Sequence, residues 1–197
     1  MKKMFCIIGQ ICSGKNTICE MIKQQYSGIH QLVYYTNRPM RDGEEDGVDY
    51  HFLKDKTLNI HDDDVIECRV YEAYLGNSNE KILVQYGTVL DDQFNNMYLM
   101  VPCAVDQLGF YIDYFGPDKI SVIYLNPSKD ILIERAMNRG DNLIEFHDRL
   151  ERDSKWYSEE TISKLKAKFS YNSWLELSGG DLMESYDTIN AFIRKNL

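Results

Sequence analysis

The segment GQICSGKNT, residues 9–17, combines glycines, a lysine and hydroxyl side chains in a short run. Gly9 and Gly14 let the backbone turn tightly and aim its N–H groups inward, while Lys15 adds a cation. A short apolar run, residues 4–8, precedes the segment and a helical pattern follows it. This order of strand, loop and helix start predicts a cradle for a nucleoside triphosphate, the alternative being an ordinary glycine turn. The predicted binding residues are Gly9, Ser13, Gly14, Lys15, Asn16 and Thr17.

The hydroxyl that binds Mg²⁺ in such loops usually follows the lysine directly, but here Asn16 occupies that place. Thr17 supplies a hydroxyl one residue later, and this GKxT spacing is typical of nucleoside monophosphate kinases. Phosphate oxygens and water provide most Mg²⁺ ligands at such sites, so a loosely anchored ion is expected. The sequence therefore predicts a nucleoside triphosphate with Mg²⁺ as cofactor, and Thr17 as the metal ligand.

Composition limits the class of protein. With 197 residues and 44% hydrophobic content, the chain can bury one substantial core with room for inserted lobes. A net charge of −9, from 31 acidic and 22 basic residues, argues against a nucleic acid polymer or an anionic membrane as partner. Five cysteines without CxxC spacing and an N-terminus without a signal peptide predict a reduced, cytoplasmic protein. Cys12 is interpreted as a small residue in a tight turn, with a redox role as the alternative.

Hydrophobic periodicity predicts alternating strands and helices, as in an α/β fold. After the first strand, loop and helix, the expected strands are residues 32–35, 98–103, 120–125 and 174–177. The expected helices are residues 105–115, 130–139, 144–156 and 182–197. Between residues 48 and 90 the pattern changes to short strands, which predicts a small antiparallel lobe inserted in the main sheet. Its strands are expected at residues 49–52, 65–71 and 82–86, with a turn at 76–79.

Residues 34–52, YYTNRPMRDGEEDGVDYHF, resemble the segment TTRxxRxGExxGxDYxF of guanylate kinases. The likeness continues at Glu67, in QYGT at residues 85–88 and in DQLG at residues 106–109, and with the GKxT loop it spans most of residues 4–150. The resemblance implies a P-loop three-layer α/β fold with a parallel central sheet, an inserted small mixed α/β acceptor-binding lobe and a helical lid. It also implies transfer of the γ-phosphate of ATP to GMP or dGMP.

The expected organisation is a single guanylate kinase-like domain over residues 1–197. Its core comprises residues 1–33, 98–130 and 157–197, the acceptor-binding lobe residues 34–97, and the lid about residues 131–156. The expected partners are small nucleotides, ATP and a nucleoside monophosphate. The oligomeric state does not follow from the sequence.

Arg38 and Arg41 lie three residues apart around Pro39 in an extended loop. Two guanidinium forks so spaced can converge on one monophosphate, and each can donate bidentately. Tyr50 and Tyr86 can add phenolic donors to the same oxygens. For either arginine alone, a solvated surface position is the alternative.

The resemblance places Glu67, Thr88 and Asp106 in the pocket for guanine. Guanine presents an N1–H and an amino group side by side, so one carboxylate can accept from both, whereas the N1 lone pair of adenine repels it. Glu67 therefore predicts guanine. The alternative is a solvent-facing carboxylate on an edge strand, since neighbouring Cys68 and Arg69 leave the facing of the strand open.

Arg135 and Arg139 are four residues apart on one predicted helical face, and Arg149 follows after a polar break. This arrangement resembles the kinase lid, whose arginines close over both phosphate chains and neutralise charge during in-line transfer. The expected catalytic residues are Lys15, Arg135, Arg139 and Arg149. A surface helix whose arginines pair with nearby carboxylates is the alternative.

Two other functions stay open. The chain carries more residues near positions 72–83 than is usual in the family, so a kinase for another (deoxy)nucleoside monophosphate is one alternative. A non-catalytic guanylate-kinase-like binding module is the other, although such a module has no use for a triphosphate cradle. The family's contacts to the donor base have no clear counterpart here, because only SGGD occurs at residues 178–181.

Overall fold

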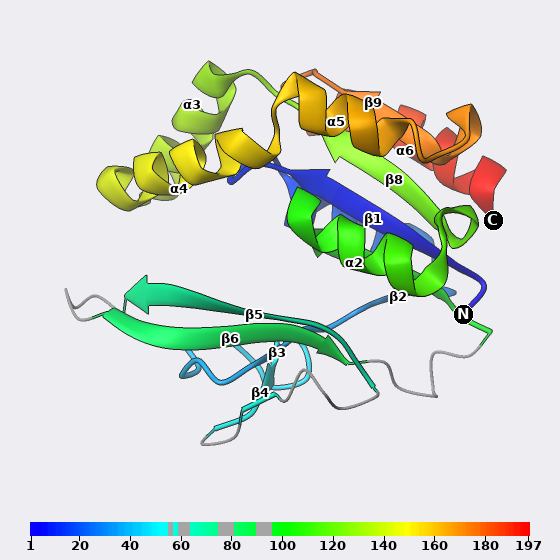
Figure 1. Ribbon diagram of the computed structural model, residues 1–197. Helices are drawn as coiled ribbons and strands as arrows, with labels where there is room; N and C mark the ends of the chain where they lie inside the picture. Colours follow the sequence, from blue (N-terminus) through cyan, green and yellow to red (C-terminus); the bar gives the residue numbers. More distant parts are fainter. Residues whose placement is uncertain (55–56, 59–63, 75–80, 90–95) are drawn as a thin grey trace. The chain divides into compact units, whose positions relative to one another are not determined.

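The computed structural model describes residues 1–54, 57–58, 64–74, 81–89 and 96–197. The chain divides into two compact units, a larger one of residues 1–31 and 96–197 and a smaller one of residues 32–95. Figure 1 shows the elements of both. The functional division into core, acceptor lobe and lid stays a prediction.

The larger unit is built on a five-stranded parallel sheet in the order β2, β7, β1, β8, β9. The central strand β1 pairs with both neighbours, so that Ile8 lies opposite Cys103 on one side and Tyr124 on the other. Residues 4–9 of β1 are all buried, which explains why this strand is a continuous apolar run. The strands are β1 (Lys3–Gly9), β2 (Ile29–Gln31), β7 (Tyr98–Cys103), β8 (Ile120–Leu125) and β9 (Trp174–Leu177).

Helices cover this sheet. Buried residues of α1 and α6 form one core cluster with Phe5 and Ile7 of β1. Helix α2 packs against β1 and β8, and in Figure 1 it lies in front of the sheet. The helices are α1 (Lys15–Gln25), α2 (Val105–Phe115), α3 (Lys129–Arg139), α4 (Leu143–Trp156), α5 (Glu159–Lys166) and α6 (Leu182–Asn196), with short 3₁₀ turns η2 (Pro117–Lys119) and η3 (Tyr171–Ser173).

Local signals set the ends of α3 and α4. The Ser128 hydroxyl accepts a hydrogen bond from the backbone of Ile131 at the start of α3, and Asn142 caps α4 in the same way. Helix α3 ends at Arg139 and is capped by Gly140, whose φ of 78° is in the left-handed region that glycine adopts without strain. A short connection therefore joins α3 to α4, and buried Leu132, Ala136, Phe146 and Leu150 pack between them.

The smaller unit holds a four-stranded sheet in the order β4, β3, β6, β5. Strands β3 and β4 are parallel, while β6 runs antiparallel to both β3 and β5, so the sheet is mixed. In the β5–β6 pair Glu67 lies opposite Thr88 and Arg69 opposite Tyr86. The strands are β3 (Tyr35–Thr36), β4 (His51–Phe52), β5 (Val65–Tyr74) and β6 (Lys81–Val89).

The structure confirms the predicted strands at residues 98–103, 120–125 and 174–177 and the helix at 105–115. The predicted strand at residues 32–35 is wrong: β2 ends at Gln31 and β3 begins at Tyr35, because the chain passes from one sheet to the other within this apolar run. Helix α5 was not predicted, since only Ile162 of its eight residues is buried. The predicted lobe is mixed, not purely antiparallel, and its predicted turn at 76–79 lies outside the described residues.

Within the described parts of the chain, no helix combines the length and the apolar character needed to cross a bilayer.

Candidate active site

The loop after β1 has the shape that its glycines predict. Helix α1 begins at Lys15, directly after Gly14, whose φ of 101° is accessible to glycine. A Cβ on Gly9 would lie 2.4 Å from the Ser13 hydroxyl and 2.7 Å from the Leu125 carbonyl oxygen, so no larger residue fits there. The Ser13 hydroxyl is itself buried and lacks a hydrogen-bond partner among the described residues. A buried, unpaired hydroxyl in a loop of this geometry fits a bound phosphate oxygen.

Lys15 lies in the loop with its ammonium directed at backbone oxygens. Its Nζ donates to the carbonyl of Gly9 at 2.6 Å and to that of Gln10 at 2.9 Å. The pKa of this ammonium is lowered to about 8, mainly by burial and then by the positive charge of Arg149, while the Asp153 carboxylate opposes the shift. The cation is thus held at the loop, where a phosphate chain would meet it.

This lowered pKa predicts how nucleotide binding depends on pH. The ammonium loses its proton as pH rises through about 8, and only the charged form attracts the outer phosphates. We expect kcat/KM for ATP to fall about tenfold per pH unit above this pKa, because that ratio reports ionisation of the free enzyme. A pH profile of wild type beside Lys15→Ala checks this. The variant should lack the alkaline limb, and an identical limb in both proteins would contradict the assignment.

The three arginines predicted for the lid occupy α3 and α4. Arg135 Nη1 donates to the Cys12 carbonyl at 3.2 Å and to the Ser13 carbonyl at 2.9 Å, and its Nη2 contacts the Gly180 carbonyl. Arg135 therefore stabilises the backbone of the phosphate loop through hydrogen bonds. A catalytic role for Arg135 stays a prediction.

Arg139 lies one turn after Arg135 and also reaches the loop. Its Nε donates to Asp141 Oδ1 at 2.7 Å, and its Nη2 lies 3.4 Å from the sulfur of Cys12. The Arg139 hydrogen bond lowers the pKa of Asp141, so this partner is a carboxylate. Burial raises the pKa of the Cys12 thiol, which favours the structural interpretation of that residue over a reactive one. Arg149 is exposed on α4, and its charge acts on Lys15.

Two residues that bind the loop were missed at the sequence level. The backbone N–H of Ile11 donates to Asp153 Oδ2 at 3.0 Å, and that of Gly9 donates to the Tyr157 hydroxyl at 3.0 Å. With Arg149 these side chains recur every four residues, which places them on one face of α4 and its end. This four-residue spacing was the sequence signal that could have grouped Asp153 and Tyr157 with Arg149. Burial raises the pKa of Tyr157, so it binds the loop as a neutral phenol.

Asp153 should contribute measurably to stability through the loop. Asp153→Ala leaves the Ile11 N–H without its charged acceptor, which should lower the free energy of unfolding by about 1.5–3 kcal/mol. Urea unfolding is the measurement, with Asp148→Ala as the matched control on an exposed position of the same helix. Equal stabilities of the two variants would show that the contact contributes nothing.

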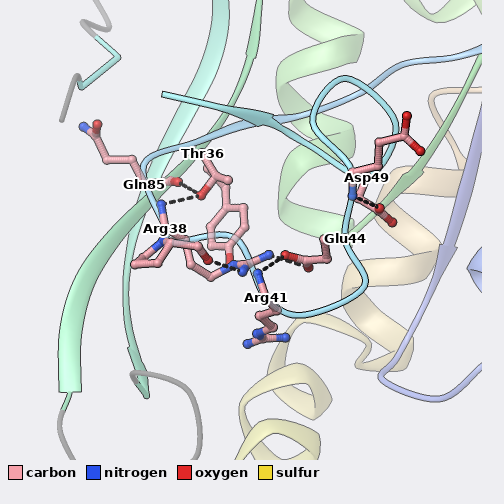
Figure 2. Close-up of polar contacts among 9 residues, drawn as sticks. Thr36, Arg38, Arg41, Glu44, Asp49 and Gln85 are labelled. Carbon is pink, nitrogen blue, oxygen red and sulfur yellow. Dashed lines mark hydrogen bonds and ion pairs between the residues drawn. The ribbon is translucent and has the colours of Figure 1, made fainter. Parts of the chain in front are cut away.

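In the smaller unit, Arg38, a predicted phosphate ligand, is buried among polar partners. Its side chain is only 5% exposed. Nε donates to the Tyr86 hydroxyl at 3.1 Å, Nη1 to the Pro39 carbonyl at 2.6 Å and Nη2 to Glu44 Oε1 at 2.7 Å. Figure 2 shows the Glu44 carboxylate beside this guanidinium. The Glu44 carboxylate thus already accepts from one of the guanidinium nitrogens that the sequence predicts to bind a phosphate.

Arg41 differs from Arg38. It is exposed, and its backbone N–H, not its guanidinium, donates to Glu44 Oε2 at 2.8 Å. In Figure 2 the Arg41 guanidinium points away from Glu44. The two arginines are therefore joined through Glu44, a residue that sequence reasoning did not single out. The sequence signal for Glu44 was the GE pair at residues 43–44, within the segment that resembles guanylate kinases.

Hydrogen bonds of the Thr36 hydroxyl hold the loop that carries Arg38 against β6. The Thr36 hydroxyl donates to the Gln85 carbonyl at 2.7 Å and accepts from the backbone N–H of Arg38 at 3.1 Å, as Figure 2 shows. Aromatic rings enclose the other side of the guanidinium, which lies 5.2 Å from the ring centroid of Tyr50 and 5.6 Å from that of Phe52. Arg38 is therefore fixed in position before any ligand binds.

Two of the three residues predicted to contact the base, Glu67 and Thr88, meet on the β5–β6 pair. Glu67 is buried, and its Oε1 accepts from the Thr88 hydroxyl at 3.0 Å. The solvent-facing alternative for Glu67 is therefore wrong. The register of the β5–β6 pair shifts between Val65 and Glu67, so simple alternation along the strand does not decide which way Glu67 faces. Asp106 lies in the first turn of α2 and belongs to the larger unit.

The loop residues fit the triphosphate that the sequence predicts. Asn16 and Thr17 are exposed in the first turn of α1, where the helix dipole favours anions. In the described residues no three His, Cys, Asp or Glu side chains cluster to hold a metal ion. Thr17 as the protein ligand of a phosphate-bound Mg²⁺ stays a prediction.

A parallel sheet with this loop after its central strand defines a P-loop α/β protein. A family model described as guanylate kinase matches residues 1–90. The guanylate kinase of Chlorobium chlorochromatii is 31% identical over 147 residues, which cover 71% of this chain and 72% of that protein. The guanylate kinase of Chlorobium luteolum is 32% identical over 133 residues, or 64% of this chain and 62% of that protein.

A solved structure agrees in fold. The crystal structure of guanylate kinase from Anaplasma phagocytophilum superposes with a TM-score of 0.61 at 17% identity, covering 98% of this chain and 84% of that one. The chain belongs to the guanylate kinase family.

Proposed function

We propose that this protein transfers the γ-phosphate of ATP to GMP or dGMP with Mg²⁺, giving ADP and GDP or dGDP. The observation that carries the proposal is the buried Glu67 carboxylate, held by Thr88 in the same unit as the buried Arg38 fork. A carboxylate that can contact the base and an arginine that can bind phosphate, both within one small unit, suit a nucleoside monophosphate. Membership of the guanylate kinase family supports the same reaction and a role in purine nucleotide metabolism.

The donor side relies on the phosphate loop. Lys15 and the inward N–H groups would bind the outer phosphates of ATP, and Thr17 would contact the metal. Mg²⁺, when bound, supplies positive charge to the β- and γ-phosphate oxygens. In the transfer, an oxygen of the acceptor phosphate forms a bond to the γ-phosphorus while the bond to the bridging oxygen of ADP breaks.

The arginines of α3 and α4 would act on the charge that spreads over the transferred group. Arg139 and Arg149 are exposed at this end of the larger unit, and the charge of Arg149 already acts on Lys15. The acceptor phosphate is anionic before it reacts, so the step needs neither a general base nor a covalent intermediate. Stabilisation of charge and orientation supply the rate enhancement.

Release of ADP with ATP–Mg²⁺ and a panel of acceptors tests the proposal. We expect turnover with GMP and dGMP and at least about a hundredfold lower kcat/KM with AMP, CMP and UMP. Preference for another acceptor would overturn the guanine assignment and favour a different nucleoside monophosphate kinase. Absence of turnover together with absence of ATP binding would instead favour a binding module.

A further inference from the structure

Arg69 lies beside the predicted base reader on strand β5. Its Nε donates to Glu67 Oε2 at 3.1 Å, two residues away on the same face of the strand. The side chains are 16% exposed for Arg69 and 0% exposed for Glu67. Thr88 donates to the other carboxylate oxygen at 3.0 Å. The buried carboxylate therefore has a cation on one oxygen and a hydroxyl on the other.

Aromatic contacts fix the position of Arg69. Its guanidinium carbon lies 5.2 Å from the ring centroid of Tyr71, and this ring lies 6.0 Å from that of Tyr86. The Tyr86 hydroxyl in turn accepts from Arg38. Arg69 thus belongs to a chain of contacts that runs from the base reader to the phosphate-binding arginine within one unit.

The ion pair determines what kind of hydrogen-bonding group Glu67 offers. A carboxylate without a cation is costly to bury and tends to take up a proton. An ionised carboxylate only accepts hydrogen bonds, whereas a protonated one also donates. The first form suits the adjacent N1–H and amino group of guanine. The second form can also pair with adenine, donating to its N1 and accepting from its amino group.

We propose that Arg69 is a specificity-determining residue of the acceptor site, which acts through Glu67. It keeps the buried carboxylate ionised, so that the site accepts a base with two adjacent N–H donors and rejects one with a lone pair at that edge. This inference rests on the proposed function, because it takes Glu67 as the group that contacts the base. It adds a residue to the selection of the acceptor and leaves the transfer step unchanged.

Binding of GMP and AMP, measured by calorimetry without ATP, tests the proposal independently of catalysis. For Arg69→Met we expect the ratio of the AMP and GMP dissociation constants to fall at least about tenfold, and Arg69→Lys should restore most of it. Arg69→Gln keeps a neutral donor next to Glu67 and should also lose discrimination, which preserves the test if the methionine variant fails to fold. Arg194→Met, exposed on α6, is the control and should bind as wild type does.

A double-mutant cycle separates this role from a structural one. With Glu67→Gln already present, Arg69→Met should change the ratio by less than about twofold, since the charge it serves is gone. Undiminished discrimination in Arg69→Met and Arg69→Gln, or fully additive effects in the cycle, would overturn the proposal. A wild-type protein that binds GMP selectively but does not phosphorylate it contradicts the kinase function alone. A wild-type protein that binds neither nucleotide contradicts both.

Discussion

Replacing Lys15 by alanine should lower kcat for GMP phosphorylation by about a thousandfold. The ammonium of Lys15 is held at the start of the loop by the Gly9 and Gln10 carbonyls, where it would contact the outer phosphates as their charge shifts. Removing it takes away a fixed cation that water cannot replace, because a preorganised charge costs no reorganisation during the reaction. Steady-state kinetics with ATP–Mg²⁺ and GMP measure the loss.

The matched control is Lys23→Ala, on the same helix α1, where the lysine pairs with Glu20 at the surface. That variant should keep wild-type turnover, because the Lys23 ammonium pairs with a surface carboxylate, and such pairs contribute little. Thermal unfolding of both variants shows whether each is folded. A folded Lys15→Ala protein with wild-type kcat would remove the loop from the catalytic account.

Arg139→Ala should also lower kcat by about a thousandfold, within the range seen for arginines that stabilise charge on a transferred phosphoryl group. Arg139 is paired with Asp141 and lies against Cys12, so its guanidinium is already at the phosphate loop. The phosphate chain would replace Asp141 as its partner when nucleotide binds. KM for ATP should change much less than kcat, because the interaction is made mainly in the transition state.

Arg152→Ala provides the comparison, since that arginine is exposed on α4 and has no assigned part in the site. It should leave both kcat and KM near their wild-type values. If Arg139→Ala raised KM for ATP and left kcat intact, Arg139 would be a ground-state contact and not a catalytic residue.

Much of the larger unit could be predicted because its elements are strongly patterned. Residues 120–125 are all buried in β8, and such a run reads clearly as an internal strand. The end of α2 could also be predicted from local sequence, because a glycine followed by a proline, Gly116 and Pro117, ends a helix. The phosphate loop was found for the same reason, since its glycines and Lys15 lie within a few residues of each other.

The remaining parts depend on contacts between distant residues. Asp153 and Ile11 are 142 positions apart, so the four-residue spacing that includes Asp153 indicates a shared helical face but not that this face binds the backbone of the loop. In the sequence Arg69 looks like any other charged residue on a strand, and only the structure shows that Glu67 is buried beside it. Polar residues on amphipathic elements look alike in sequence, whether they face solvent or a partner.

The most direct test of the proposed reaction follows the phosphate itself. ATP labelled at the γ-phosphorus is incubated with Mg²⁺, GMP and the protein, and the labelled products are separated. We expect the label in GDP, in an amount equal to the ADP formed, and a roughly thousandfold lower initial rate of labelling with Lys15→Ala. Label released as inorganic phosphate, or ADP formed at the same rate without GMP, would contradict the assignment of GMP as acceptor.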